Sequence, residues 1–396
     1  MARQALLSLL LLALVACNVC SAASQNETYH VSRPIKVADK IETNLVFARG
    51  AEHSEIITSP KASFIAVHFA DFSLNNGDLV IVRSPDATTA FTYDAEGVRR
   101  QSSFVADLVP GESAVIEYFP SVTTTTSGAG DRAGSGVAFR INAYSRGIAG
   151  TAKQEALCDN DDMVQAKCFA PGSLFYDLRP LAYERGLAVA RLLIGGSSVC
   201  TGWLIGSAGH LMTNAHCVAD EAMASTIHVE FGAEAATCLQ KCDEWLACKG
   251  TTVALSTTLV ARNSSHDYAL LKLPDDVDLR PWGYLQLRKE GVLLGESIYV
   301  PNHALAWGKR LAVMNGGQMI TADFFHPRGH CGQNAILFSG DIQKGASGSP
   351  AIAASDNKVV GLVTCGGTCE PEDAAEDITL IIADLERQGI HIPDAY

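Results

Sequence analysis

A serine between two glycines stands in the stretch GDIQKGASGSPAI, residues 340–352. Ser347 could be a nucleophile or part of a tight turn, and the short motif alone favours the turn. A serine hydroxyl is a poor nucleophile at neutral pH, so catalysis needs a histidine that takes the proton and a carboxylate that orients the histidine. The motif therefore predicts catalysis only if the chain supplies both partners.

Two earlier segments supply these residue types. His216 follows a strand-like run in HLMTNAHCVAD, and Asp267 opens an apolar strand in SSHDYALLKL. Taken singly, His216 could be a hydrogen-bonded core histidine and Asp267 a polar residue at the start of a strand. The chain order His, Asp, Ser differs from the orders of the α/β-hydrolases and the subtilisins, and it favours the catalytic interpretation.

Five segments in this order resemble motifs of the chymotrypsin-like serine peptidases. They are VCTGWLIG (199–206), LMTNAHCV, DYALLKL, GASGSP and VTCGG (363–367). The resemblance implies that His216 is the general base, Asp267 its orienting acid and Ser347 the nucleophile. The chain has Ser-Gly-Ser-Pro where most of the family has Ser-Gly-Gly-Pro, and in this it resembles the secreted lysyl and glutamyl endopeptidase branch.

The resemblance also implies further roles around this triad. Cys200 would pair with Cys217 and brace the histidine loop. The amides of Gly345 and Ser347 would form the oxyanion hole, which requires a glycine-rich loop so that two N–H groups can point the same way. Thr364 would stand beside the buried aspartate. No cofactor and no metal is implied, and the expected partners are protein or peptide substrates.

The specificity pocket of such a fold is walled by the segment before the serine and by the strand after it. Asp341 lies six residues before Ser347, the spacing of the specificity aspartate in trypsin-like members, while Thr364 and Gly366 fall on the opposite wall. Asp377 is a competing candidate that could instead cap the final helix. An acid in this pocket would select a cationic side chain, so we expect cleavage after Arg or Lys, determined by Asp341.

Ala346 occupies the position at which trypsin-like zymogens carry the aspartate that pairs with a new N-terminus. No Ile-Val-Gly-Gly segment precedes the first barrel strands. We therefore expect the oxyanion loop to be ordered without N-terminal insertion. Inhibition by a preceding domain would then act by covering the cleft or through folding.

Length and composition predict two units. The 396 residues are 47% hydrophobic, enough for two cores, and the net charge of −13 argues against nucleic acid as a partner. Residues 1–23 combine Arg3 with an apolar run at 5–16, as in a cleaved secretory signal. The alternative is a membrane anchor, for which the run is short. We expect a secreted monomer that does not associate with membranes.

Short β-rich runs separated by turn clusters predict a small β-sandwich in residues 24–150, which would be a propeptide or an accessory binding module. The β-rich runs of residues 151–396 predict an all-β barrel region with a C-terminal helix in ITLIIADLERQGI, and the resemblance implies that it is a peptidase domain of two six-stranded β-barrels. A catalytically idle binding or inhibitory protein on the same barrel is the alternative.

Ten cysteines remain after the signal, an even number that favours disulfides in a secreted protein. Zinc bound by Cys238, Cys242 and Cys248 is a weaker alternative, because paired metal-ligand spacings are missing. Asn26 and Asn263 stand in possible N-glycosylation motifs.

Overall fold

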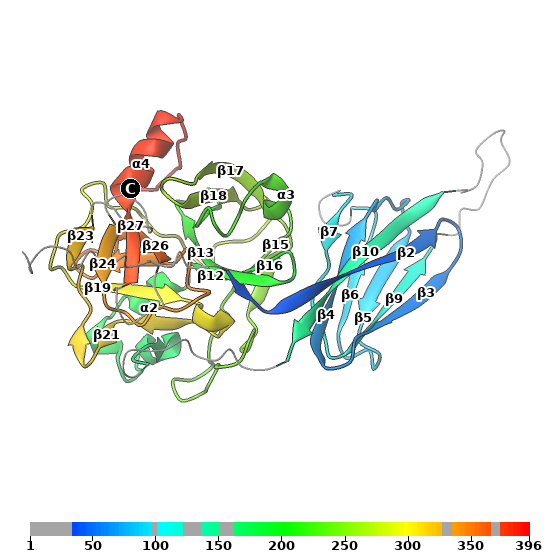
Figure 1. Ribbon diagram of the computed structural model, residues 1–396, viewed down its shortest axis with the longest axis horizontal. Helices are drawn as coiled ribbons and strands as arrows, with labels where there is room; N and C mark the ends of the chain where they lie inside the picture. The colour runs from blue at the N-terminus through cyan, green and yellow to red at the C-terminus, as the bar shows by residue number, and fades with distance from the viewer. Residues whose placement is uncertain (1–33, 97–100, 122–135, 150–160, 327–334, 366–372) are drawn as a thin grey trace, which may run out of the picture.

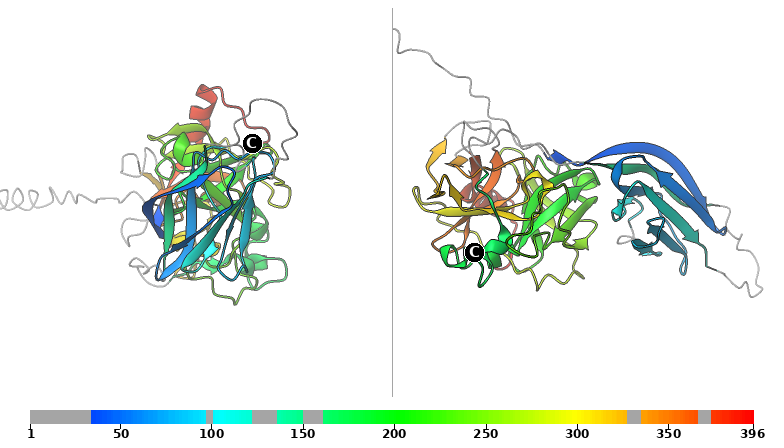
Figure 2. Two further views of the ribbon diagram at one scale, coloured as in Figure 1. Left: turned by 90° about the vertical axis from the view of Figure 1, so that its right-hand side faces the viewer. Right: turned by 90° about the horizontal axis from the view of Figure 1, so that it is seen from below.

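The computed structural model describes residues 34–396 apart from 97–100, 122–135, 150–160, 327–334 and 366–372. Two all-β units lie side by side along the long axis, a sandwich and a larger double barrel (Figures 1 and 2). The predicted signal segment, Asn26 and Gly366 lie outside the described residues.

The smaller unit is a sandwich of two antiparallel sheets. Alternation builds its core: from Ile141 onward every second residue of β10 is buried, and Phe139 stacks on Phe47 with ring centroids 4.3 Å apart. One sheet contains β2 (Ala38–Ala48), β10 (Val137–Ile148), β4 (Ala62–Ala70), β7 (Phe104–Val105) and β8 (Val109–Pro110). The other contains β3 (His53–Thr58), β9 (Ser113–Phe119), β5 (Leu79–Arg83) and β6 (Ala90–Tyr93).

The first barrel closes because the two ends of its sheet come from one stretch of chain. The strand order is β16 (Thr251–Ala254), β15 (Ile227–Phe231), β12 (Val189–Ile194), β13 (Ser198–Ile205), β14 (His210–Thr213), β18 (Tyr268–Lys272) and β17 (Thr258–Asn263). Since only residues 255–257 separate β16 from β17, they count as one strand, and the expected six-stranded barrel results. The sheet also contains β1 (Ile35–Lys36), a strand that was not predicted.

The second barrel sheet carries short additional strands at its ends. Its order is β11 (Val164–Gln165), β20 (Arg310–Ala312), β19 (Ile298–Asn302), β25 (Pro350–Ala353), β26 (Val359–Cys365), β27 (Asp373–Asp377), β24 (Ala335–Phe338) and β23 (Phe324–His326). Strands β21 (Met314–Asn315) and β22 (Gln318–Met319) form a separate hairpin. The fold class is therefore the predicted one, with strands beyond six per barrel.

Helices are few and short. The predicted C-terminal helix is α4 (Ile378–Arg387), which buries Ile378, Ile381, Ile382 and Leu385. The others are α2 (Ala182–Gly186), α3 (Glu221–Ala224) and the 3-10 turns η1 (Ala166–Phe169), η2 (Tyr176–Leu178) and η3 (Ala304–Ala306). Within the described ranges, none of the helices has the length and apolar character needed to cross a membrane.

Candidate active site

His216 and Asp267 come from two neighbouring strands of the first barrel. His216 follows β14 and Asp267 precedes β18, and these strands pair with Thr213 opposite Ala269. His216 Nδ1 lies 2.7 Å from Asp267 Oδ2, and the His216 amide donates to Asp267 Oδ1 at 2.9 Å. Thr364 of β26 donates its hydroxyl to Asp267 Oδ2. Asp267 Oδ2 therefore orients the imidazole and Oδ1 holds the His216 main chain, which leaves Nε2 as the second polar atom of the ring.

The main chain holds the same two loops together. The Asp267 carbonyl accepts from the Asn214 side chain at 2.8 Å and from the Ala215 amide at 3.1 Å. Asp267 itself has a φ of 43°, in the left-handed region that aspartate tolerates better than most residues. The histidine–carboxylate pair is thus fixed by backbone contacts as well as by its own hydrogen bonds.

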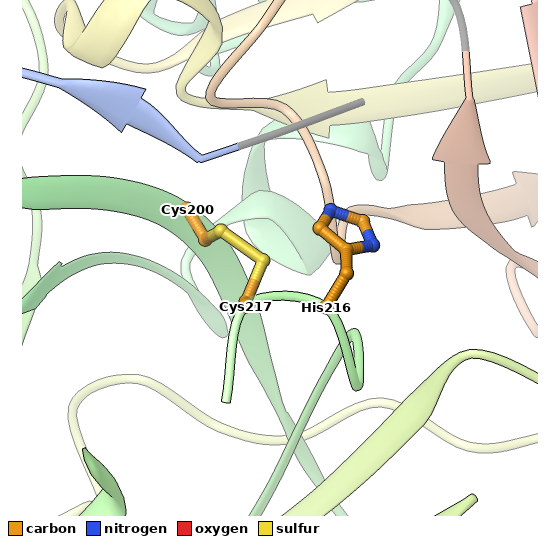
Figure 3. Close-up of side chains that lie close together, drawn as sticks. All are labelled: Cys200, His216 and Cys217. Atoms are coloured by element: carbon orange, nitrogen blue, oxygen red, sulfur yellow. A yellow bond between two sulfur atoms is a disulfide. The ribbon is translucent and has the colours of Figure 1, made fainter. Parts of the chain in front are cut away.

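Cys200 and Cys217 form a disulfide beside His216 (Figure 3). The ligand atoms of these three residues lie within 4.8 Å of one another, but the two sulfur atoms are bonded to each other. The bridge ties the histidine loop to β13 and is not a metal site. The alternative of zinc bound by Cys238, Cys242 and Cys248 is also wrong. Cys238 forms a disulfide with Cys168, and Cys242 forms one with Cys248.

Ser347 lies in a loop that hydrogen bonds to β13. The Thr201 amide donates to the Ser347 carbonyl, and the Thr201 hydroxyl to the Gly345 carbonyl, both at 2.9 Å. Gly345 and Gly348 have φ values of 94° and 88°. A Cβ on Gly348 would lie 2.2 Å from the Thr201 carbonyl oxygen, so this close approach to β13 requires glycine.

Ser347 Oγ and His216 Nε2 are both buried and are not hydrogen bonded to each other. Ser347 is 1% exposed, and neither its Oγ nor His216 Nε2 has a hydrogen-bond partner within the described part of the chain. Such bonds are often loose in peptidases without substrate and tighten when substrate binds. Ser347 and His216 therefore remain candidates for a nucleophile and its base.

Similarity to known proteins identifies the family of the chain. A family model of the trypsin-like peptidase domain matches residues 200–362, which contain all three triad candidates. The chain belongs to the trypsin-like peptidase family. It is 35% identical over 347 residues to the secreted RxLR effector protein 73 of Plasmopara viticola, covering 85% of this chain and 82% of that protein.

Solved structures of low similarity were also matched. The HtrA-type protease AlgW with a tripeptide is 19% identical with a TM-score of 0.39, covering 54% of this chain and 64% of that one. The inactive form of Rv3671c from M. tuberculosis is 17% identical with a TM-score of 0.38, covering 56% and 95%. Deg5 is 16% identical with a TM-score of 0.39, covering 54% and 94%.

Ala346 is fully buried in this trypsin-like domain. It belongs to an apolar cluster that includes Met163 and Ile342. Met163 lies next to β11, at the start of the described part of the peptidase domain. Packing of apolar side chains therefore holds the loop before Ser347 at the point where an ion pair would otherwise be needed.

The two candidates for the specificity residue, Asp341 and Asp377, make different contacts. Asp341 is half-buried, with a φ of 54°, and its Oδ2 accepts from the Asp162 amide at 3.1 Å. Burial raises the pKa of Asp341, and the nearby charges of Asp161 and Asp162 add to this. Asp377 accepts from the Thr379 amide at 2.9 Å and caps α4, the alternative that the sequence left open.

Asp373 is an acidic residue beside the segment before Ser347 that sequence reasoning missed. It is 7% exposed, and its Oδ2 accepts from the amides of Gly340 and Ile342, each at 3.0 Å. These amides flank Asp341, so the Asp373 carboxylate supports the segment that leads to Ser347. The acidic run EDAAED gave no signal that distinguished this aspartate from its neighbours.

A second histidine–carboxylate pair lies behind the first. His266 precedes Asp267, and its Nδ1 lies 2.7 Å from Oε1 of Glu376, which is fully buried on β27. Burial, with the nearby charges of Asp267 and Asp377, raises the pKa of Glu376 to about 8. A carboxyl group that resists ionisation thus lies close to the orienting aspartate.

Asn263, a predicted glycosylation site, is engaged in the fold. Its side-chain nitrogen donates to the buried Asp384 of α4 at 2.8 Å. This is the atom to which a glycan would be attached. A glycan at Asn263 would therefore have to break a contact between the end of β17 and the final helix.

Proposed function

We propose that this chain is a secreted serine endopeptidase that cleaves peptide bonds through Ser347, His216 and Asp267. The observation that carries the proposal is the 2.7 Å contact between His216 Nδ1 and Asp267 Oδ2, and it is supported by the buried Ser347, whose Oγ has no hydrogen-bond partner among the described residues. The carboxylate keeps the proton on Nδ1, so Nε2 is the free base.

The reaction uses this chain's residues in two stages. Ser347 Oγ attacks the scissile carbonyl while His216 Nε2 takes its proton, and the amides of Gly345 and Ser347 stabilise the oxyanion. His216 then gives the proton to the leaving amine, the C–N bond breaks and an acyl-enzyme remains. Water, deprotonated by His216, hydrolyses the ester and restores Ser347. Asp267 stabilises the imidazolium in both stages.

We further propose that cleavage follows Arg or Lys, with Asp341 as the acidic determinant, and that residues 24–150 act as a propeptide. Secretion is supported by the disulfides and by the relative, whose printed name describes it as secreted.

A second candidate is a catalytically idle binding protein on the same fold. It is favoured by the relative's name as an effector and by the missing bond between His216 Nε2 and Ser347 Oγ. Single variants distinguish the two functions. Ser347→Ala, His216→Ala and Asp267→Asn should each lower kcat by roughly 10⁴, and the losses should not add, because the residues act as one unit. Peptidase activity that persists in Ser347→Ala would refute the assignment.

A further inference from the structure

One edge of β13 next to Ser347 is left unpaired by the other strands of the first barrel. Along Ser198–Trp203 this strand pairs with β12, whereas its other edge pairs with β14 only from Trp203 to Ile205. On that second edge the Thr201 amide donates to the Ser347 carbonyl. An extended peptide lying across Ser347 would meet the edge of β13 at residues 198–200, where strand addition supplies main-chain hydrogen bonds.

The chain's own strand β1 occupies this edge. Ile35 pairs with Val199 and Lys36 with Ser198 in antiparallel register, directly before Cys200. The amides of Val37 and Ala38 donate to the Ser197 carbonyl at 2.8 and 3.2 Å. These bonds fix the end of β1 against β13 at the point where the chain enters the sandwich. Figure 3 shows β1, the pale blue strand, near the Cys200–Cys217 bridge.

Ile35 extends this contact to the oxyanion loop. It is 8% exposed, and a Cβ placed on Gly345 would lie 3.1 Å from Ile35 Cγ2. The Leu305 amide donates to the Lys344 carbonyl at 2.6 Å, which links the loop to the same region. Ile35 belongs to an apolar cluster shared by the sandwich and the barrels, with Val37, Phe64, Val105, Leu193, Val199, Leu305, Ala306 and Trp307 among its members.

We propose that β1 is an autoinhibitory strand that occupies the binding surface for the leaving-group side of an extended peptide. The segment before Ser347 and β26 wall the proposed specificity pocket, so the edge of β13 lies on the other side of the scissile bond. A strand edge accepts one partner, and substrate and β1 therefore exclude each other. This inference rests on the proposed peptidase function and names its regulation by the sandwich.

The test compares the full chain with Ile35→Asp, which places a charge in the shared cluster. The matched control is Ile56→Asp on β3, since Ile56 is 63% exposed. Denatured casein serves as the extended substrate, and a pool of N-acyl aminoacyl anilides, with no residues after the scissile bond, as the short one. We expect the rate of casein cleavage to rise about tenfold or more in Ile35→Asp, because burial of the isoleucine side chain no longer stabilises the docked position of β1.

The short anilides should gain much less, and Ile56→Asp should leave both rates unchanged. Equal casein cleavage by the wild type and Ile35→Asp would overturn the inference. If circular dichroism shows that Ile35→Asp is unfolded, Ile35→Ala takes its place with a smaller expected gain.

A binding measurement separates this inference from the proposed function. In a Ser347→Ala background, Ile35→Asp should bind casein peptides more tightly and lose hydrogen-exchange protection over residues 196–201. If peptide binding tightens and protection is lost, but no protein that retains Ser347 cleaves casein, the proposed peptidase function is refuted. The role of β1 as the strand that blocks peptide binding then still stands. Unchanged binding and protection would refute the role of β1, even in an active enzyme.

Discussion

Replacing Gly345 with alanine tests whether the oxyanion loop needs its present backbone. Gly345 has a φ of 94°, and an L-residue with this φ destabilises the folded state by about 1–2 kcal/mol. The new Cβ would also lie 2.9 Å from the His303 carbonyl oxygen and 3.1 Å from the Ala306 amide nitrogen, closer than ordinary contact. Such crowding adds about 1–3 kcal/mol. We expect the loop to relieve this strain by turning the Gly345 amide away from the substrate carbonyl.

Losing one oxyanion donor lowers kcat by about 10²–10³. The matched control is Gly111→Ala in the sandwich, because Gly111 has a φ of 97° and no atom within 4 Å of the added Cβ. Gly111→Ala should show only the backbone cost in urea unfolding and keep full kcat. A folded Gly345→Ala protein that retains kcat within a few-fold of the wild type would refute the assigned role of this amide.

Further expected outcomes concern specificity, activation and pH. Asp341→Ser should lower kcat/KM for Arg and Lys substrates far more than for apolar ones, and an unchanged peptide-library profile would exclude this role. Asp377→Asn should keep the profile, since it removes only part of a helix cap; a changed profile would transfer the specificity role to it. Ala346→Asp should be destabilised by several kcal/mol through a buried charge, and increased activity after processing would contradict its packing role. Burial lowers the pKa of His68 to about 4, so the contribution of His68 to stability, measured as the difference in unfolding free energy between the wild type and His68→Gln, should fall by about 3 kcal/mol as pH drops from 6.5 to 4; a difference that stays constant or grows over this range would contradict it.

Candidate site residues could be identified from the sequence where they stand in local motifs. The segments around His216, Asp267 and Ser347 each place a polar residue at a strand end or a glycine turn, and the structure brings the first two within hydrogen-bond distance. The β-rich runs and the final helix followed from residue patterns, whereas the two barrels were implied by the resemblance.

Long-range contacts could not be read in the same way. Strand β1 contains only Ile35 and Lys36, and pairing with β13 joins residues far apart in the chain without any periodic signal. The direction of the Asp341 carboxylate depends on a backbone with positive φ and on the Asp162 amide, which sequence spacing alone does not specify.

Labelling with a fluorophosphonate probe, followed by mass spectrometry of the labelled peptide, tests the central claim most directly. The probe reacts with a serine only when a neighbouring base activates its hydroxyl. The account predicts a single modified residue, Ser347, and labelling that is lost in His216→Ala and strongly reduced in Asp267→Asn. A folded wild-type protein that remains unlabelled, or labelling at Ser347 that is unaffected by His216→Ala, would contradict it.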